Sequence, residues 1–162
     1  MAEPIQSVTL RAAAPADQDF LRDVFASTRS EELVALGWNP TQSQNFIDLQ
    51  FGAQQRTYQE CYPAAENSII LLDERPIGRM IVDRSEDEIT LVDIALLPAH
   101  RNAGIGTHLL NALQHEAARA GKAVRLNVFI TNPAARLYER LGFSSVSDDG
   151  MYREMIWLPT SP

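Results

Sequence analysis

An apolar run, a glycine-containing loop and an amphipathic helix follow one another in the middle of this 162-residue chain. The run from Leu91 to Pro98 predicts a buried strand, and Ala103, Gly104 and Gly106 follow where the next helix should begin. A helix start carries unpaired backbone N–H groups and about half a unit of positive charge, so small residues there leave room for an anion. Glycines also serve tight turns, and the loop alone leaves both roles open.

Two motifs stand at the ends of one predicted helix and one predicted strand: Arg101-x-x-Gly104-x-Gly106, and the segment from Asn132 to Phe143. They resemble motifs of the GNAT superfamily of N-acetyltransferases. The first is similar to the loop with which that superfamily holds the pyrophosphate of acetyl-CoA, and the second is similar to its NxxAxxLYxxxGF motif. The resemblance covers about residues 68–158 and is only topological before that.

The resemblance implies an α/β (α+β) GNAT fold, with a mixed, mostly antiparallel sheet of about seven strands, helices on both faces and a splayed central parallel pair. The apolar runs predict strands at 7–11, 69–72, 77–82, 91–98, 123–129, 143–146 and 152–158, and helices at 15–36, 41–60, 104–120 and 133–141. In the second helix, Thr41 is the expected N-cap, and Phe46, Leu49 and Ala53 are expected to face inward, with Ile47 as a further candidate.

Composition limits the remaining possibilities. A chain with 45% hydrophobic residues can bury one core, so we expect a single domain over residues 1–162. The net charge of −7 argues against nucleic-acid binding. No leader-like start or membrane-length apolar run is present, which predicts a cytoplasmic protein without a membrane partner. Cys61 is the sole cysteine and is expected to be partly buried. A homodimer stays open.

The resemblance also implies acetyl-CoA as co-substrate, and no metal. The pyrophosphate is expected to contact the loop and the first helical turn, at Arg101, Asn102, Ala103, Gly104, Ile105, Gly106 and Thr107. The pantetheine arm is expected to pair with strand backbone at Ile94, Ala95 and Leu96. Asn132 would contact the arm, or cap the helix that follows it, and Arg136 would add positive charge.

Tyr138 matches the tyrosine that protonates the leaving thiolate in many members of the superfamily; its alternative role is core packing. Asn127 stands where some members of the superfamily carry a glutamate that acts as the general base, and an amide cannot accept the proton of the amine. Asp93 is then the nearest carboxylate, set in an apolar strand where an unpaired acid is costly to bury. It is either the general base or one half of an ion pair with Arg79. A third possibility is that a water molecule carries the proton away from the amine, in which case no side chain need act as the base.

Two functions remain from the sequence. The first is an N-acetyltransferase that passes the acyl group directly to a primary amine of a small-molecule or peptide acceptor. The second is a non-catalytic acyl-CoA-binding sensor or interaction module. The acidic chain would suit a cationic amine. Gln50, Gln54 and Tyr58 share a helix face that is either a solvent-exposed stripe or a wall of the acceptor pocket.

Overall fold

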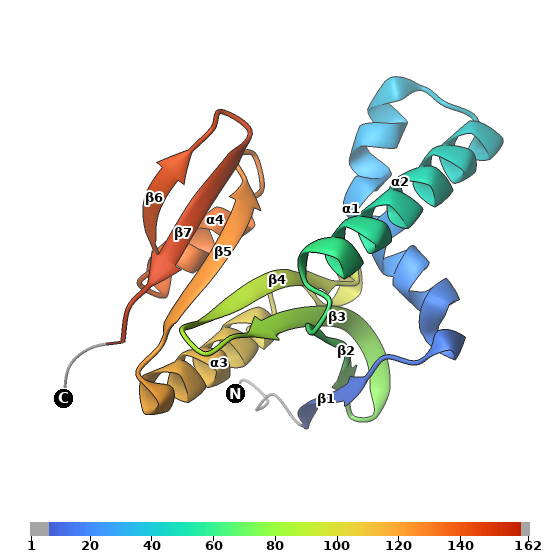
Figure 1. The fold of residues 1–162 in the computed structure, drawn as a ribbon. Coiled ribbons are helices and arrows are strands. Elements are labelled where there is room, and N and C mark those ends of the chain that lie inside the picture. Colours follow the sequence, from blue (N-terminus) through green and yellow to red (C-terminus); the bar gives the residue numbers. More distant parts are fainter. Residues whose placement is uncertain (1–6, 160–162) are drawn as a thin grey trace.

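Seven strands form one mixed sheet in the order β1-β2-β3-β4-β5-β7-β6 (Figure 1). The computed structural model describes residues 7–159. The strands are β1 (Val8–Ala12), β2 (Glu66–Leu72), β3 (Arg75–Arg84), β4 (Glu88–Leu96), β5 (Ala123–Phe129), β6 (Ser144–Asp148) and β7 (Tyr152–Trp157). All neighbours are antiparallel except β4 and β5, which are parallel. The prediction of a mixed, mostly antiparallel sheet is confirmed.

Helices cover both faces of this sheet (Figure 1). They are α1 (Gln18–Leu36), α2 (Pro40–Cys61), α3 (Ile105–Ala120) and α4 (Ala134–Arg140), with short 3-10 turns η1 (Pro15–Asp17) and η2 (Pro98–His100). One buried cluster joins α1 and α2 to one face, and a larger cluster joins α3 and α4 to the other. Among residues 7–159, no helix combines the length and the apolar character needed to cross a bilayer.

Helix α2 begins at a capping box that starts two residues before the predicted cap. The Asn39 side chain accepts the Gln42 backbone N–H at 2.8 Å, the Gln42 side chain accepts the Asn39 N–H at 3.1 Å, and Pro40 occupies the first turn. The assignment of Thr41 as N-cap is therefore wrong, because Asn39 already satisfies these donors. Cys61, the last residue of α2, is exposed rather than partly buried.

The buried stripe of α2 passes through Ile47 and Phe51, which lie four residues apart on one face. Phe51 packs against Phe25 of α1 at 5.7 Å between ring centroids. Leu49 is 70% exposed and Ala53 is exposed as well, so the prediction that these two face inward is wrong. Contact with α1 sets the rotation of α2 about its axis.

Helix α3 follows its predicted core stripe. Ile105, Leu109, Leu113 and Ala117 are all buried against the sheet, and their spacing keeps one apolar face toward it. Gly121 ends the helix at a φ of 67°, a left-handed conformation that glycine adopts without steric cost. The stripe anchors the helix whose N-terminus carries the glycine loop.

The parallel pair is short, and the two strands then separate (Figure 1). Pairing runs from Glu88 opposite Ala123 to Leu91 opposite Leu126 and stops there. Beyond these residues, β4 remains paired with β3 and β5 remains paired with β7. The edges of β4 and β5 that face each other are therefore unpaired over their second halves, as predicted for the splayed pair.

A β-bulge marks the point of separation. Leu91 opposes Val82 and Asp93 opposes Ile81, so Val92 is an extra residue on β4. A bulge bends its strand and increases the local twist, which turns the end of β4 away from β5.

Gly78 lets β3 and β4 approach closely beyond this bulge. A Cβ at Gly78 would lie 2.2 Å from the Ala95 carbonyl oxygen, which is part of the β4 backbone and cannot rotate away. We therefore expect Gly78→Ala to lower the free energy of unfolding by about 1–3 kcal/mol. Urea unfolding followed by circular dichroism would measure this. Unchanged stability would show that β4 moves freely here.

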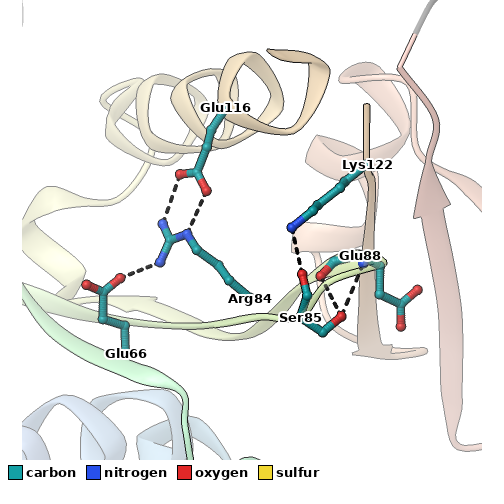
Figure 2. A network of polar contacts seen from close by, with 6 residues as sticks. All are labelled: Glu66, Arg84, Ser85, Glu88, Glu116 and Lys122. Atoms are coloured by element: carbon teal, nitrogen blue, oxygen red, sulfur yellow. Dashed lines mark hydrogen bonds and ion pairs between the residues drawn. The ribbon is translucent and has the colours of Figure 1, made fainter. Parts of the chain in front are cut away.

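The closed end of the parallel pair is held by ion pairs and hydrogen bonds (Figure 2). Arg84, at the end of β3, bonds Glu116 of α3 through Nε at 2.6 Å and Nη2 at 3.0 Å. It also pairs with Glu66 at the start of β2. One guanidinium thus connects the sheet to α3.

The turn before β4 is fastened in the same region (Figure 2). Lys122 Nζ donates to the Ser85 carbonyl at 2.7 Å, and the Ser85 hydroxyl exchanges hydrogen bonds with the Glu88 backbone. Arg125 of β5 bonds the Glu88 carboxylate at 3.0 Å. These contacts hold β4 and β5 together where their pairing begins.

Candidate active site

The glycine loop supplies an open helix N-terminus. Gly104 is the N-cap of α3 and has a φ of 83°. This left-handed conformation is strained for a residue with a side chain, so the turn favours glycine here. Gly106 is different, because a Cβ there would meet Leu137 Cδ2 at 3.5 Å, an ordinary contact. The fold therefore does not require a glycine at 106. A backbone left open at this position suits a phosphate that approaches the first turn.

Arg101 fastens this loop to the rest of the protein. Its Nε donates to the Leu96 carbonyl at 2.9 Å, and its Nη2 donates to the Ser27 hydroxyl of α1 at 3.2 Å. Arg101 therefore connects the end of β4, the loop and α1. Phosphate binding by Arg101 stays a prediction. The structure adds that Arg101 positions the loop through these two hydrogen bonds.

The other predicted loop residues differ in what they can offer a ligand. Asn102 and Ala103 are exposed, and Asn102 has a φ of 59°. The Ile105 side chain is buried in the core, so only its backbone could contact a ligand. Thr107 is half-buried in the first turn of α3.

The unpaired half of β4 holds the residues predicted to meet the pantetheine arm. Ile94, Ala95 and Leu96 are half-buried, and each pairs with β3 on the opposite edge. The Leu96 carbonyl already accepts the bond from Arg101. Backbone groups at Ile94 and Ala95 are thus the better candidates for contacts across the open edge.

Helix α4 carries the second motif. The Asn132 side chain accepts the Ala134 N–H at 2.9 Å, so its capping role is present. Arg136 is exposed. Tyr138 is 6% exposed and packs edge-on against Phe143 at 5.8 Å between ring centroids, which means that most of its ring belongs to the core. Packing and proton donation are compatible, because the ring makes the core contacts and the hydroxyl would make the donation.

Tyr138 and Asp93 influence each other electrostatically. Burial raises the pKa of Tyr138, and the charge of Asp93 raises it further. Such a hydroxyl stays protonated throughout the physiological pH range, which is the form a proton donor needs. Tyr138 of α4 therefore senses the charge of Asp93 on β4.

Asp93 forms the expected ion pair with Arg79. Arg79 Nε lies 3.7 Å from Asp93 Oδ2, and the two side chains are 3% and 24% exposed, respectively. Burial raises the pKa of the Asp93 carboxyl, and the positive charges of Arg79 and Arg29 oppose that rise. The ion-pair interpretation is confirmed. It does not exclude the base role, because part of the carboxylate is still accessible.

Two residues of α2, Gln55 and Tyr58, contact Arg79 of this ion pair, which the sequence did not predict. Arg79 Nη2 lies 3.3 Å from Gln55 Oε1, and its guanidinium lies 6.0 Å from the ring centroid of Tyr58. Gln50, Gln54 and Tyr58 are all partly buried, so the interpretation of this face as a solvent-exposed stripe is wrong. In the sequence, Arg79 stands out as a charged residue within an otherwise apolar strand, which is why it could be named as the partner of Asp93.

A cleft of about 390 Å³ opens beside the same residues, between the start of α1, the end of α2 and strands β2 and β3. Its polar lining residues are Gln18, Gln55, Tyr58, Gln59, Tyr62 and Asn67.

Comparison with known proteins gives this arrangement a family. Residues 59–145 match the family described as acetyltransferase (GNAT) domain. The chain is 31% identical over 106 residues to the [ribosomal protein bS18]-alanine N-acetyltransferase of Haemophilus influenzae, covering 65% of this chain and 70% of that protein.

Solved structures share the fold. The PaiA N-acetyltransferase of Thermoplasma acidophilum, in complex with coenzyme A, superimposes with a TM-score of 0.69 at 17% identity, covering 94% of this chain and 99% of that one. An acetyltransferase of Thermus thermophilus gives 0.67 at 19% identity, covering 95% and 98%. Together with the sequence matches, these likenesses show that the chain belongs to the GNAT acetyltransferase family and is an acyltransferase.

Proposed function

We propose that the protein is an acetyl-CoA-dependent N-acetyltransferase that passes the acetyl group directly to a primary amine. The observation that carries this proposal is the splayed strand pair. The unpaired half of β4 includes Asp93, and the loop that opens α3 follows this strand after η2. An acyl donor anchored at the loop would reach Asp93 and Tyr138 along this opening.

Binding would rely on backbone groups more than on charged side chains. The first N–H groups of α3 would receive the pyrophosphate, with Gly106 leaving room for it. Ile94 and Ala95 would pair with the amides of the pantetheine arm as a neighbouring strand does. Asn132 is held by its bond to Ala134 and would face the arm from the turn before α4.

The chemistry needs one proton acceptor and one proton donor. Asp93 would take a proton from the acceptor amine, directly or through a water, as the nitrogen bonds to the thioester carbon. The carbon–sulfur bond then breaks, and Tyr138 would donate its hydroxyl proton to the departing sulfur. Protons balance, since the amine loses one, the thiolate gains one and solvent restores both side chains.

Release of the CoA thiol with a panel of primary amines tests the proposal. We expect acetyl-CoA consumption that depends on the added amine, with mass spectrometry showing a gain of one acetyl group on that amine. Tight acetyl-CoA binding without amine-dependent thiol release would contradict transfer to an amine.

A substitution at Gly106 tests the phosphate loop. Because position 106 accepts a side chain without strain, Gly106→Glu should fold normally, and an acidic residue in the first turn even favours the helix. We expect acetyl-CoA affinity to fall about 10- to 100-fold through like charge and bulk, as measured by calorimetry. Gly106→Gln, of equal size but neutral, separates the two effects. Unchanged affinity in Gly106→Glu would remove the loop assignment.

The sequence-based expectations of a cytoplasmic location, a homodimer, no nucleic-acid partner and one domain over residues 1–162 stay predictions. Residues 1–6 and 160–162 lie outside the described part of the chain.

A further inference from the structure

The buried polar groups near Asp93 are incompletely satisfied. Within residues 7–159, the side-chain atoms that are buried without a hydrogen-bond partner are Arg29 Nε, Gln54 Oε1, Arg79 Nε and Arg79 Nη1. The 3.7 Å separation of Arg79 Nε from Asp93 is too long for a hydrogen bond. Unpartnered buried groups are rare in folded proteins, and each needs an explanation. Three of these four are guanidinium donors.

Four elements bring these groups to one side of the sheet. Arg79 opposes Ala95 and Asp93 opposes Ile81, so both side chains point from β3 and β4 toward the layer of α1 and α2. Tyr58 of α2 lies over Arg79, and Gln54 lies one helical turn before Tyr58.

Arg29 of α1 faces the same region. Its charge acts on both the Asp93 carboxyl and the Tyr58 hydroxyl, and its guanidinium lies 5.2 Å from the centre of the Phe25 ring. Its side chain is 37% exposed, so it is accessible from outside, as part of Asp93 is. Arg79, at 3% exposed, lies behind them.

The arginine donors in this region lack acceptors. Arg29 Nε, Arg79 Nε and Arg79 Nη1 have no hydrogen-bond partner among residues 7–159. Glu32 lies 4.0 Å from Arg29 Nη1, but its side chain is 65% exposed, and such surface pairs are weak. A ligand carboxylate would supply acceptor oxygens for these donors.

Other acids at the open end of the sheet have partners of their own. Glu154 pairs with Arg125. Asp148 and Asp149 accept backbone N–H groups of their own turn. These three acids are therefore engaged by protein groups, which makes them poorer partners for a polyamine.

We propose that the acceptor is a small amine that carries a carboxylate within a few bonds of its amino nitrogen, as a free amino acid does. The carboxylate would lie on Arg29 with Arg79 behind it, and the amino group would lie between Asp93 and the Gln54 carbonyl oxygen. This inference rests on the proposed acetyl transfer. It replaces the cationic acceptor that the net charge of −7 suggested, because unpartnered donors at the site act at contact distance, whereas salt screens the total charge beyond about 10 Å.

Matched pairs of amines test the acceptor class. Glycine, leucine, glutamate and lysine would each be compared with the corresponding amide, which keeps the amino group and removes the carboxylate; spermidine represents the polycations. We expect the best amino acid to exceed its amide by about 10- to 100-fold in kcat/KM, measured by CoA thiol release.

Two arginine variants on α1 locate the effect. Arg29→Met should bring the ratio between amino acid and amide close to one, mainly by raising KM for the amino acid. Arg22→Met is the matched control, because Arg22 pairs with Asp48 instead and should leave the ratio unchanged.

The outcomes separate the two proposals. Amides or spermidine acetylated as well as the amino acids would overturn the acceptor class while leaving acetyl transfer intact. An amino-acid preference that survives Arg29→Met would overturn the assigned site. If the protein binds acetyl-CoA but acetylates none of these amines, the acceptor class is overturned, and the wider amine panel of the proposed function decides whether acetyl transfer fails as well.

Discussion

Tyr138→Phe is expected to lower turnover by about 10²- to 10⁴-fold, the usual contribution of a positioned acid or base. The substitution removes only the hydroxyl and keeps the ring against Phe143. Because the pKa of Tyr138 is raised above its ordinary value and a thiol titrates near 8.5, the hydroxyl would first stabilise the departing sulfur by a hydrogen bond and pass its proton late, as the carbon–sulfur bond breaks. Single-turnover rates of acetyl transfer measure the chemical step directly.

Two controls separate this role from packing. Acetyl-CoA affinity and melting temperature should stay near the parent values in Tyr138→Phe, since the buried ring remains. The loss of rate should shrink with an acyl donor whose thiol is more acidic, because a better leaving group needs less help. Unaffected turnover with acetyl-CoA would make Tyr138 a packing residue and leave protonation of the sulfur to water.

Asp93→Asn is expected to lower turnover at neutral pH by about 10²- to 10⁴-fold with little effect on acetyl-CoA affinity. In the parent enzyme, activity requires the ionised carboxylate and is therefore lost as the pH falls through its pKa. Burial raises that pKa, so the acid limb should lie above the range of an exposed aspartate, near 3.9. The variant should lose this limb, which a pH profile of kcat would show.

The ion pair provides the competing explanation, and stability separates the two. Asp93→Asn leaves Arg79 buried without its anion, which is destabilising by itself. Asp83→Asn, a half-buried aspartate on β3 with no assigned role, is the matched control for turnover. Normal turnover in an Asp93→Asn protein that melts earlier would assign Asp93 to structure alone.

Local patterns predicted the fold well. The core stripe of α3 and the position of Gly121 follow from residues close in sequence, and the structure has both. The capping box of α2 was also readable, since Asn39 and Gln42 have the spacing of that motif, but the cap was assigned to Thr41. The inward face of α2 was less accessible, because packing against α1 decides it.

The candidate site was predictable only where a motif carries it. The hydrogen bond from Arg101 to Ser27 joins residues 74 positions apart, and no local sequence pattern predicts it. The environment of Asp93 likewise depends on Tyr58 and Arg29, which come from two helices that the family resemblance covered only topologically. Long-range packing, more than local propensity, decides which charges meet.

The splayed strand pair has a consequence for how such proteins diverge. Where β4 and β5 separate, a ligand would meet peptide groups, and these are the same whatever side chain each residue bears. The course of the main chain, set by the bulge at Val92 and the close approach at Gly78, therefore matters more to such contacts than the side chains at positions 94–96. These side chains could differ while the backbone edge stays the same, as is consistent with a shared fold at 17–19% identity.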